Sequence, residues 1–234
     1  MIRGIFLFFS CLSMANAAQY ALQVGDTTVI IKQQHHGYGK AFVHVHQNET
    51  TALKAARAVV KAKGGSVLTL VHPGGGRNVV FHVGKRRYEF DPNRIYTDRG
   101  IKKTLTEFGS YSRVAHQEVK KLATKITSLL PQGKIIAVHN NSTYSLKNYF
   151  RGHDLARDAQ AININKRHFY RNFYLATNQH DYTRFRQLNF NSVWQATDVV
   201  DDGSLSVYLS RNRYVNVEAG YDQLAEQIRM LRYA

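Results

Sequence analysis

Residues 41–65 decide the fold, beginning Ala41-Phe-Val-His-Val-His46 and ending at Gly64-Gly65. The opening segment is apolar and alternates its side chains between two faces, as a strand does. Thr50 or Thr51 is then expected to cap a helix, because apolar residues recur behind it at helical spacing up to the glycine pair. A strand is predicted directly afterwards. This strand–helix–strand unit is typical of α/β proteins.

The rest of the chain extends the pattern. Ile135–Val138 is continuously apolar, as a central strand covered on both faces should be. For the segment 140–193, the sequence predicts only loops, one or two helices and a strand. The remaining expected elements are strands at Thr28–Ile31 and Ser66–Val71, hairpins at 79–90 and 205–217, and helices at Ser112–Leu130 and Tyr221–Arg232. We predict one α/β domain with a mixed, largely parallel β-sheet flanked by helices.

The N-terminus is typical of a secretory signal peptide over residues 1–17. Arg3 supplies the positive charge, an apolar run follows, and Ala15-Asn16-Ala17 fits the cleavage site. An uncleaved anchor and lipidation at Cys11 are the alternatives. Cleavage would leave a catalytic domain at 18–234, periplasmic or secreted and not inserted in the membrane. Cys11 is the only cysteine, so this domain could form no disulfide and use no thiolate.

The charge of the chain indicates an anionic partner. Lys and Arg total 32 and Asp and Glu total 16, a formal net charge of +16. Such a field attracts nucleic acid, acidic lipid or carboxylate-rich cell-wall polymer. Export argues against nucleic acid. A uniformly solvated, solubilising surface is the alternative reading.

His46, Glu49 and His139 are the candidate metal ligands. His46 ends the strand predicted at 41–46, Glu49 follows three residues later after a short turn, and His139 directly follows the central strand. Ligands of open α/β sheets bind beyond the carboxyl ends of the strands. Two imidazoles and a carboxylate suit one Zn²⁺ ion, with the fourth position left for water. The alternative is that both histidines only form hydrogen bonds in loops.

Further polar residues complete the candidate site. Glu218 follows a late strand and could take a proton from a metal-bound water; it could equally be an acid before the last helix. Arg94, after Asp91-Pro92-Asn93, could clamp a substrate carboxylate, or pair on the surface with a nearby aspartate. An oxyanion could be stabilised by one of three arginines, Arg77, Arg86 or Arg87.

These motifs, in this order, resemble the zinc metallocarboxypeptidase superfamily, near its succinylglutamate desuccinylase and aspartoacylase branch. The resemblance covers residues 46–218 and includes His46-x-x-Glu49, Asp91-Pro-Asn-Arg94, Val138-His-Asn-Asn141 and Glu218. It implies water-mediated hydrolysis of an amide bond at one zinc ion. The roles it implies are metal ligation by His46, Glu49 and His139, catalysis by Glu218 and Arg87, and substrate binding by Asn93, Arg94 and Asn140.

The chain also departs from that pattern. It is shorter than typical peptidases of the superfamily, its oxyanion arginine is not uniquely placed, and no tyrosine clearly corresponds to the one that peptidases fold over the substrate.

Three functions follow from these observations. The first is an exported carboxypeptidase or amidohydrolase whose partner is a peptide or N-acyl amino acid, with peptidoglycan peptides as natural candidates. The second is a non-catalytic basic module that holds cell-wall polymer or another polyanion on a peptidase-like scaffold. The third is a secreted nucleic-acid-binding protein using the aromatic and basic segment 167–174; we expect that segment to be partly buried instead.

Overall fold

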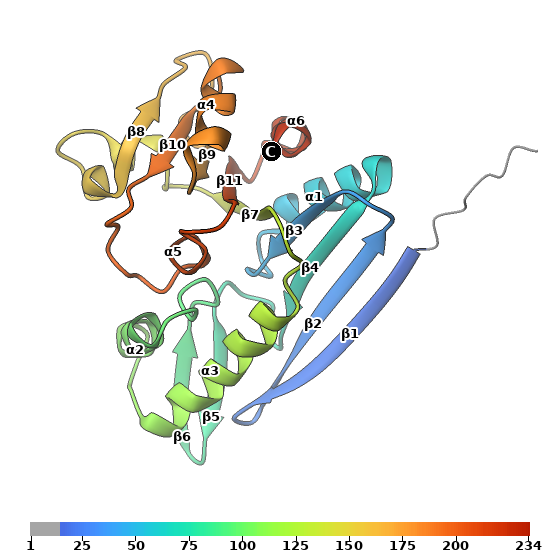
Figure 1. The fold of residues 1–234 in the computed structure, drawn as a ribbon. Helices are drawn as coiled ribbons and strands as arrows, with labels where there is room; N and C mark the ends of the chain where they lie inside the picture. Colours follow the sequence, from blue (N-terminus) through green and yellow to red (C-terminus); the bar gives the residue numbers. More distant parts are fainter. Residues whose placement is uncertain (1–14) are drawn as a thin grey trace, which may run out of the picture.

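The computed structural model describes residues 15–234, which build a nine-stranded sheet (Figure 1). The strands lie in the order β1-β2-β4-β3-β7-β11-β9-β10-β8, and β5 and β6 form a separate hairpin. Their bounds are β1 Ala15–Val24, β2 Thr27–His36, β3 Lys40–His44, β4 Gly65–Val71, β5 Val79–Val83, β6 Arg86–Phe90, β7 Ile135–Asn141, β8 Ala159–Asn163, β9 Phe173–Ala176, β10 Ser192–Gln195 and β11 Tyr214–Gly220.

The sheet is mixed, and its centre is parallel. Strands β4, β3, β7 and β11 run parallel to one another. On one side of this centre, β2 pairs antiparallel with both β1 and β4. On the other side, the β11–β9 and β10–β8 pairs are antiparallel. The predicted α/β class with a mixed sheet is therefore confirmed. The parallel centre brings the carboxyl ends of β3, β7 and β11 to the same edge, where His46, Glu49, His139 and Glu218 lie.

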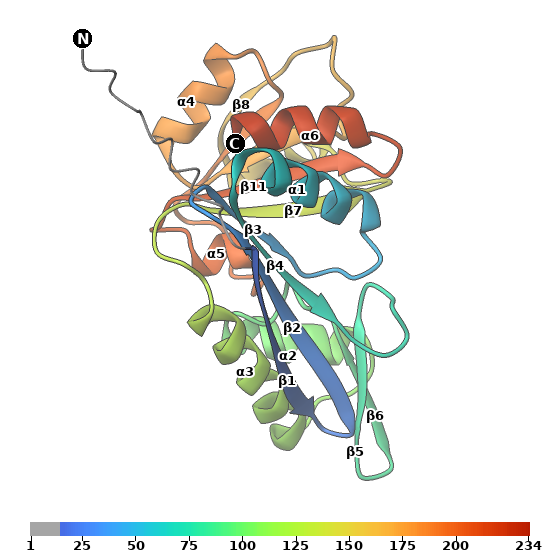
Figure 2. The same cartoon turned by 90° about the vertical axis from the view of Figure 1, so that its right-hand side faces the viewer.

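Helices cover both faces of the sheet. On one face α1 (Thr50–Lys63) lies beside α6 (Leu224–Tyr233), as Figure 2 shows, and α4 (Gln179–Gln187) packs farther along. The other face is covered by α2 (Asp98–Glu107), α3 (Arg113–Ser128), α5 (Leu205–Tyr208) and the β5–β6 hairpin. Short 3₁₀ helices occupy Leu146–Tyr149 and Ala156–Asp158.

The strand β7 shows how the sheet divides its side chains between these layers. Ile135 and Ala137 pack in the core under α3, and Ile136 and Val138 pack in the core under α1. Continuing this alternation sends His139 toward the α3 face and Asn140 toward the α1 face. The predicted run of apolar residues buried on both sides is confirmed.

Several predicted elements are confirmed and one is wrong. The strands at 28–31 and 66–71, the 79–90 hairpin and the helices at 112–130 and 221–232 all exist within a few residues of their predicted bounds. The hairpin predicted at 205–217 does not, because Leu205–Tyr208 is helical and β11 pairs with β7 and β9. Strand β1 and helix α2 had not been predicted. Of the aromatic segment 167–174, only Phe173 and Tyr174 belong to β9, and both are buried, so the expectation of a partly buried segment is confirmed.

The predicted signal peptide lies mostly outside the described residues, which begin at Ala15. Residues 15–17 of its expected cleavage site are part of β1 and pair with residues 34–36 of β2. Within the described chain, no helix combines the length and the apolar character that a bilayer crossing needs.

Candidate metal centre and adjoining cavity

A tight turn between β3 and α1 places the first two candidate ligands. The backbone N–H of Glu49 donates to the carbonyl of His46 over 3.0 Å, so the turn closes across these two residues. His44, the last residue of β3, connects this turn to β4. One of its ring nitrogens contacts the carbonyl of Glu49 at 2.9 Å, and the other contacts the Thr69 hydroxyl at 2.8 Å. His46 and Glu49 are fully buried.

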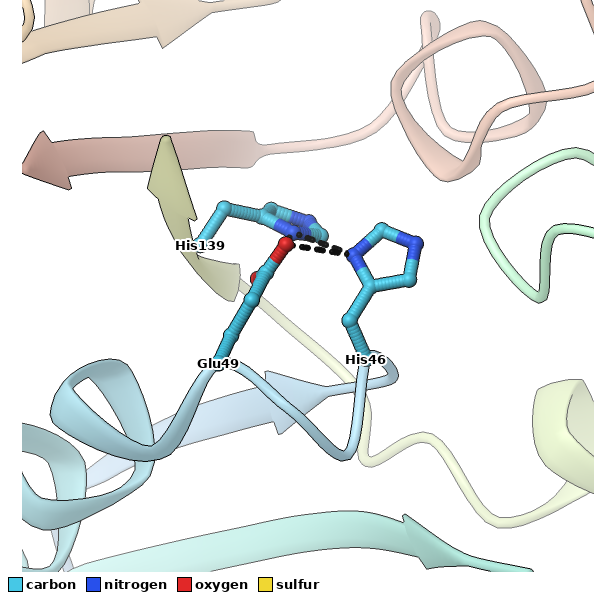
Figure 3. Close-up of side chains that lie close together, drawn as sticks. All are labelled: His46, Glu49 and His139. Atoms are coloured by element: carbon cyan, nitrogen blue, oxygen red, sulfur yellow. Dashed lines mark hydrogen bonds and ion pairs between the residues drawn. The ribbon is translucent and has the colours of Figure 1, made fainter. Parts of the chain in front are cut away.

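Three potential ligand atoms converge at this turn (Figure 3). The Nδ1 atoms of His46 and His139 are 3.1 Å apart, and each lies 2.9–3.0 Å from a carboxylate oxygen of Glu49. A tetrahedral ion with bonds of 2.0–2.1 Å would separate its ligands by about 3.3 Å. The arrangement therefore needs only a slight expansion to hold such an ion.

The contact of His46 with Asp91 determines which ring nitrogen can bind a cation. Nε2 lies 2.7 Å from Oδ1 of Asp91, and a proton on Nε2 donated to this carboxylate leaves Nδ1 bare for a cation. Burial lowers the pKa of His46, but Glu49 and Asp91 outweigh it and raise this pKa to about 9. Without a metal ion the imidazole therefore also carries a proton on Nδ1, and a cation that binds there must displace that proton.

Glu49 is the most strongly held member of the group. Its Oε1 accepts from Arg77 at 2.6 Å, and its Oε2 accepts the backbone N–H of Asn140 at 3.1 Å. Burial raises the pKa of Glu49, but His46 and His139 outweigh this and hold it well below its ordinary value. The carboxylate is thus ionised and ready to coordinate.

The start of α1 explains why Glu49 is available. Glu49 itself is the N-cap residue, yet its side chain makes no capping hydrogen bond. The amide oxygen of Asn140 instead accepts from the backbone N–H of Ala52 at 2.7 Å. The expectation that Thr50 or Thr51 caps this helix is therefore wrong, because a residue from β7 does so and leaves the Glu49 carboxylate free.

Asn140, predicted to bind substrate, is among the residues that line the adjoining cavity, and its side chain is engaged by other parts of the protein. Its side chain faces α1 and α6, where its amide nitrogen donates to Gln227 at 2.9 Å and to the Ala219 carbonyl at 3.3 Å. Both N–H groups of the side chain are thus used within the protein, and its oxygen caps α1. These contacts let Asn140 position Glu49 and the helix, and its substrate-binding role stays a prediction.

The buried group of His46, Glu49 and His139 can hold a metal ion. Its potential ligand atoms lie within 4.8 Å of one another, and two nitrogen atoms plus a carboxylate form a common donor set for borderline divalent cations. Nε2 of His139 is buried without a hydrogen-bond partner in the described structure. The donor set fits zinc but does not by itself identify the metal.

A cavity of about 540 Å³ adjoins the candidate metal centre. Glu218 lines it from β11, where it pairs in register with His139 of β7, so both side chains point to the same face. Each carboxylate oxygen of Glu218 accepts one amide N–H, from Asn141 and Asn216, at 3.0 Å. Glu218 is thus a buried strand residue beside the metal centre, not an acid at the start of the last helix.

Asn93 and Arg94 line the same cavity. The turn that carries them is held by Asp91, whose Oδ1 accepts the backbone N–H of Asn93 at 2.7 Å. Arg94 makes a loose contact of 3.5 Å with Asp202. Burial lowers the pKa of Arg94, but Asp202 and Asp91 outweigh it and raise it, so the guanidinium stays charged.

A glycine lets the Arg94 turn and the Asp202 loop meet. Gly203 has φ +78°, and a Cβ built there would lie 2.5 Å from the Arg94 carbonyl oxygen. Its own carbonyl accepts the backbone N–H of Tyr96 at 3.0 Å. A side chain at position 203 would therefore push apart the two segments that place Arg94 and Asp202.

Only one of the three candidate oxyanion arginines reaches the cavity. Arg77 lines it and bridges Glu49 and Asp91. Arg87, to which we assigned the role, lies on the β5–β6 hairpin, pairs with Glu89 at 2.5 Å and is absent from the cavity lining. Arg86 donates to the Ser110 hydroxyl. The structure brings Arg77 to the site and leaves Arg87 outside it.

The sequence reasoning missed three site residues. Asp91 was treated only as part of a turn, although an acid between the ligand segments was the available signal for a histidine-orienting carboxylate. Asn141 and Asn216 flank Glu218, and period-two spacing places them on the face that carries His139 and Glu218. That spacing could have identified them once both strands were predicted.

No protein-family model matches the chain, and no curated protein shows significant similarity to it.

Proposed function

We propose that the protein is an exported metal-dependent hydrolase, a carboxypeptidase or amidohydrolase that cleaves an amide bond in a substrate with a free carboxylate. The observation that carries the proposal is the convergence of His46 Nδ1, His139 Nδ1 and the Glu49 carboxylate beside a cavity that also contains a second buried acid, Glu218. Export is supported by the sequence of residues 1–17.

The donor set suits Zn²⁺, held by His46, Glu49 and His139. When bound, such an ion polarises the scissile carbonyl and lowers the pKa of water toward about 7. Asp91 keeps His46 in the tautomer that presents Nδ1, and Arg77 and the Asn140 backbone hold Glu49. These contacts fix the ligands before a cation arrives.

Glu218 is the proposed general base and acid. Each oxygen of its carboxylate accepts one hydrogen bond, from Asn141 or Asn216, and so keeps a lone pair that can take a proton. Glu218 would accept the proton of the attacking water and return it to the departing amine. The two amides hold the carboxylate in place without supplying a counter-charge.

Arginines flank this acid in the cavity and give the substrate its orientation. Arg94, with Asn93 beside it, would bind the substrate's carboxylate through parallel hydrogen bonds. Arg77, whose side chain is 45% exposed next to Glu49, is placed to stabilise negative charge that develops on the carbonyl oxygen.

The direct test is Glu218→Gln, which keeps the shape and the amide hydrogen-bonding capacity but removes the base. Hydrolysis of short acyl-peptides with a free terminal carboxylate should fall about 10²- to 10⁴-fold, while bound metal is retained. Glu107→Gln, on the exposed surface of α2, is the matched control. The same peptides ending in an amide should be poor substrates of the native protein.

Full activity of Glu218→Gln would refute the proposed mechanism. Equal cleavage of free and amidated termini would refute the role of Arg94. Absence of hydrolysis across peptide and N-acyl amino acid panels, by metal-loaded native protein, would refute the enzyme itself.

A further inference from the structure

The amino edge of the central strands carries a row of three cations. Lys40 is the first residue of β3, Lys134 directly precedes β7, and Arg213 directly precedes β11. Each of them comes one position before a set of residues that pair in register across these three parallel strands. The cations therefore lie side by side on neighbouring strands, which are about 4.8 Å apart, and their side chains leave the sheet on the same face.

In residues 15–234, the only acid side chain that pairs with this row is Asp181 of α4. It is fully buried and lies 3.1 Å from Lys134 and 2.9 Å from Arg213. Lys40 instead donates to two carbonyls in the last turn of α6, over 2.9 and 2.5 Å. Carbonyls at the end of a helix attract a cation, but they do not carry the full charge of a carboxylate. The row is therefore left with an excess of positive charge.

A fourth cation adds to this excess. Arg184 lies about one turn after Asp181 on α4 and forms no ion pair with any described residue. Burial, together with the charges of Lys134 and Arg184, lowers the pKa of Lys40 to about 8. Four cations are thus gathered around a single carboxylate. Like charges on neighbouring strands destabilise a sheet, and a bound anion removes that repulsion.

A cavity of about 360 Å³ lies beside the row. Lys40 and Lys134 line it, and three further hydrogen-bonding side chains do so as well: His35, Ser66 and Gln132. Gly65, with φ +118°, brings the start of β4 close to that of β3, because a Cβ there would lie 2.3 Å from the Lys40 carbonyl oxygen. The cavity shares no lining residue with the one beside the metal centre, which lies at the other edge of the sheet.

We propose that this amino edge of the sheet binds a phosphate group, with Lys40 and Lys134 as the contacting cations. A phosphate group carries about −1.5 to −2 charges at pH 7 and three strong acceptor oxygens, so it offsets the excess charge. Each lysine ammonium has three N–H groups. The protein uses two of them in Lys40 and one in Lys134, which leaves donors for the ligand.

The phosphate group can belong to free phosphate or to a larger phosphorylated molecule, because the cavity is larger than the ion. The site is separate from the metal centre, and the inference does not depend on the proposed hydrolysis. Its test is calorimetry on the full chain at about 0.15 M salt, where weak surface charge effects are screened. The ligands are inorganic phosphate, glycerol phosphate and nitrate. Tighter binding of glycerol phosphate than of inorganic phosphate identifies the larger molecule, and the reverse identifies free phosphate.

Inorganic phosphate or glycerol phosphate should bind with a Kd below about 1 mM and at least about tenfold more tightly than monovalent nitrate. Lys40→Gln should weaken this binding at least about tenfold, because it removes a charge-assisted hydrogen bond. Arg184→Gln should weaken it at least about threefold through charge alone. Lys54→Gln removes the same charge from the exposed surface of α1 and should bind like the native chain. Arg94→Gln should also bind normally, since Arg94 lines the other cavity.

No binding of either phosphate compound by the native chain at millimolar concentration overturns the inference without any variant. Unchanged binding in folded Arg184→Gln overturns it even if Lys40→Gln fails to fold, and loss of binding in Arg94→Gln places the anion at the catalytic cavity and overturns it as well. Phosphate binding at the amino edge without any peptide hydrolysis supports this site and counts against the hydrolase. Hydrolysis without phosphate binding supports the hydrolase and overturns this site.

Discussion

Two adjoining walls of the cavity differ in what their side chains contact. At the metal wall, His46, His139 and Glu49 place potential ligand atoms 2.9–3.1 Å apart. Asp91 holds His46 and Arg77 holds Glu49, whereas Nε2 of His139 has no partner in the described structure. At the Glu218 wall, on the neighbouring strand β11, the carboxylate of Glu218 accepts one amide N–H from each of Asn141 and Asn216. The first wall brings together atoms that could hold a cation, and the second holds one carboxylate by neutral donors.

The largest expected effect comes from removing a ligand at the metal wall. His139→Ala should weaken zinc binding by more than the 10- to 100-fold typical of an orienting residue, that is by at least about 100-fold. Competition with a fluorescent chelator measures this. His35→Ala, exposed near the end of β2, is the control and should bind zinc normally. Equal affinity in the two variants would remove His139 from the metal centre.

A smaller effect is expected from the residue behind His46. Asp91→Asn keeps an acceptor for Nε2 but loses the charge that fixes the tautomer and holds Arg77, so zinc affinity should fall about 10- to 100-fold. The same competition assay applies. An effect as large as that of His139→Ala would mean that Asp91 itself binds the ion.

The role of Asn140 as the cap of α1 can be tested by measuring the free energy of unfolding. Asn140→Ala leaves the Ala52 N–H and Gln227 without their partner, and buried groups left unpaired should lower the free energy of unfolding by about 2–3 kcal/mol. Urea unfolding of the metal-free protein measures it. Asn212→Ala, exposed before β11, should stay within about 0.5 kcal/mol of the native value. A neutral Asn140→Ala would contradict its assignment as the cap of α1.

The smallest effect is expected at the opposite edge of the sheet. There Asp181 pairs with Lys134, just before β7, and with Arg213, just before β11. Burial raises the pKa of Asp181, but hydrogen bonds from Arg213, Asn178 and Lys134 outweigh it and lower this pKa to about 2. Because the folded pKa lies below the unfolded value, Asp181 stabilises the protein above about pH 4, and this contribution is lost as the pH falls toward 2.

Acid unfolding curves test that sign. Asp181→Asn should lower stability by about 1–2 kcal/mol at pH 6 and should flatten the loss of stability between about pH 4 and pH 2. Asp154→Asn should follow the native curve. A steeper acid loss in Asp181→Asn than in the native protein would contradict the assignment.

The sequence predicted the metal wall better than the remaining cavity lining for a physical reason. His46, Glu49 and His139 lie at or just after the ends of apolar strands with clear periodicity, so their common edge could be deduced from the parallel arrangement. Tyr149, Asp158 and Asp202 line the cavity from short 3₁₀ helices and a turn, which carry no periodic signal.

Local spacing also failed where tertiary contacts decide. The segment 205–217 alternates like a hairpin, yet Leu205–Tyr208 forms a helix capped by Ser204 and β11 finds its partners in β7 and β9. Asn140, next to a candidate ligand histidine, suggested a binding role, whereas its side-chain hydrogen bonds lie on the α1 face of the sheet and could not be deduced from its position. Arg77 and Arg87 could not be separated before the loop and hairpin that carry them were placed.

Metal analysis of the purified chain tests the central claim most directly, combined with X-ray absorption at the metal edge. The account predicts one divalent ion per chain, with two imidazole nitrogens and carboxylate oxygen in its coordination sphere, and its loss in Glu49→Ala. A chain that takes up no ion from zinc-containing buffer, or an ion whose coordination sphere contains no imidazole, would contradict the account.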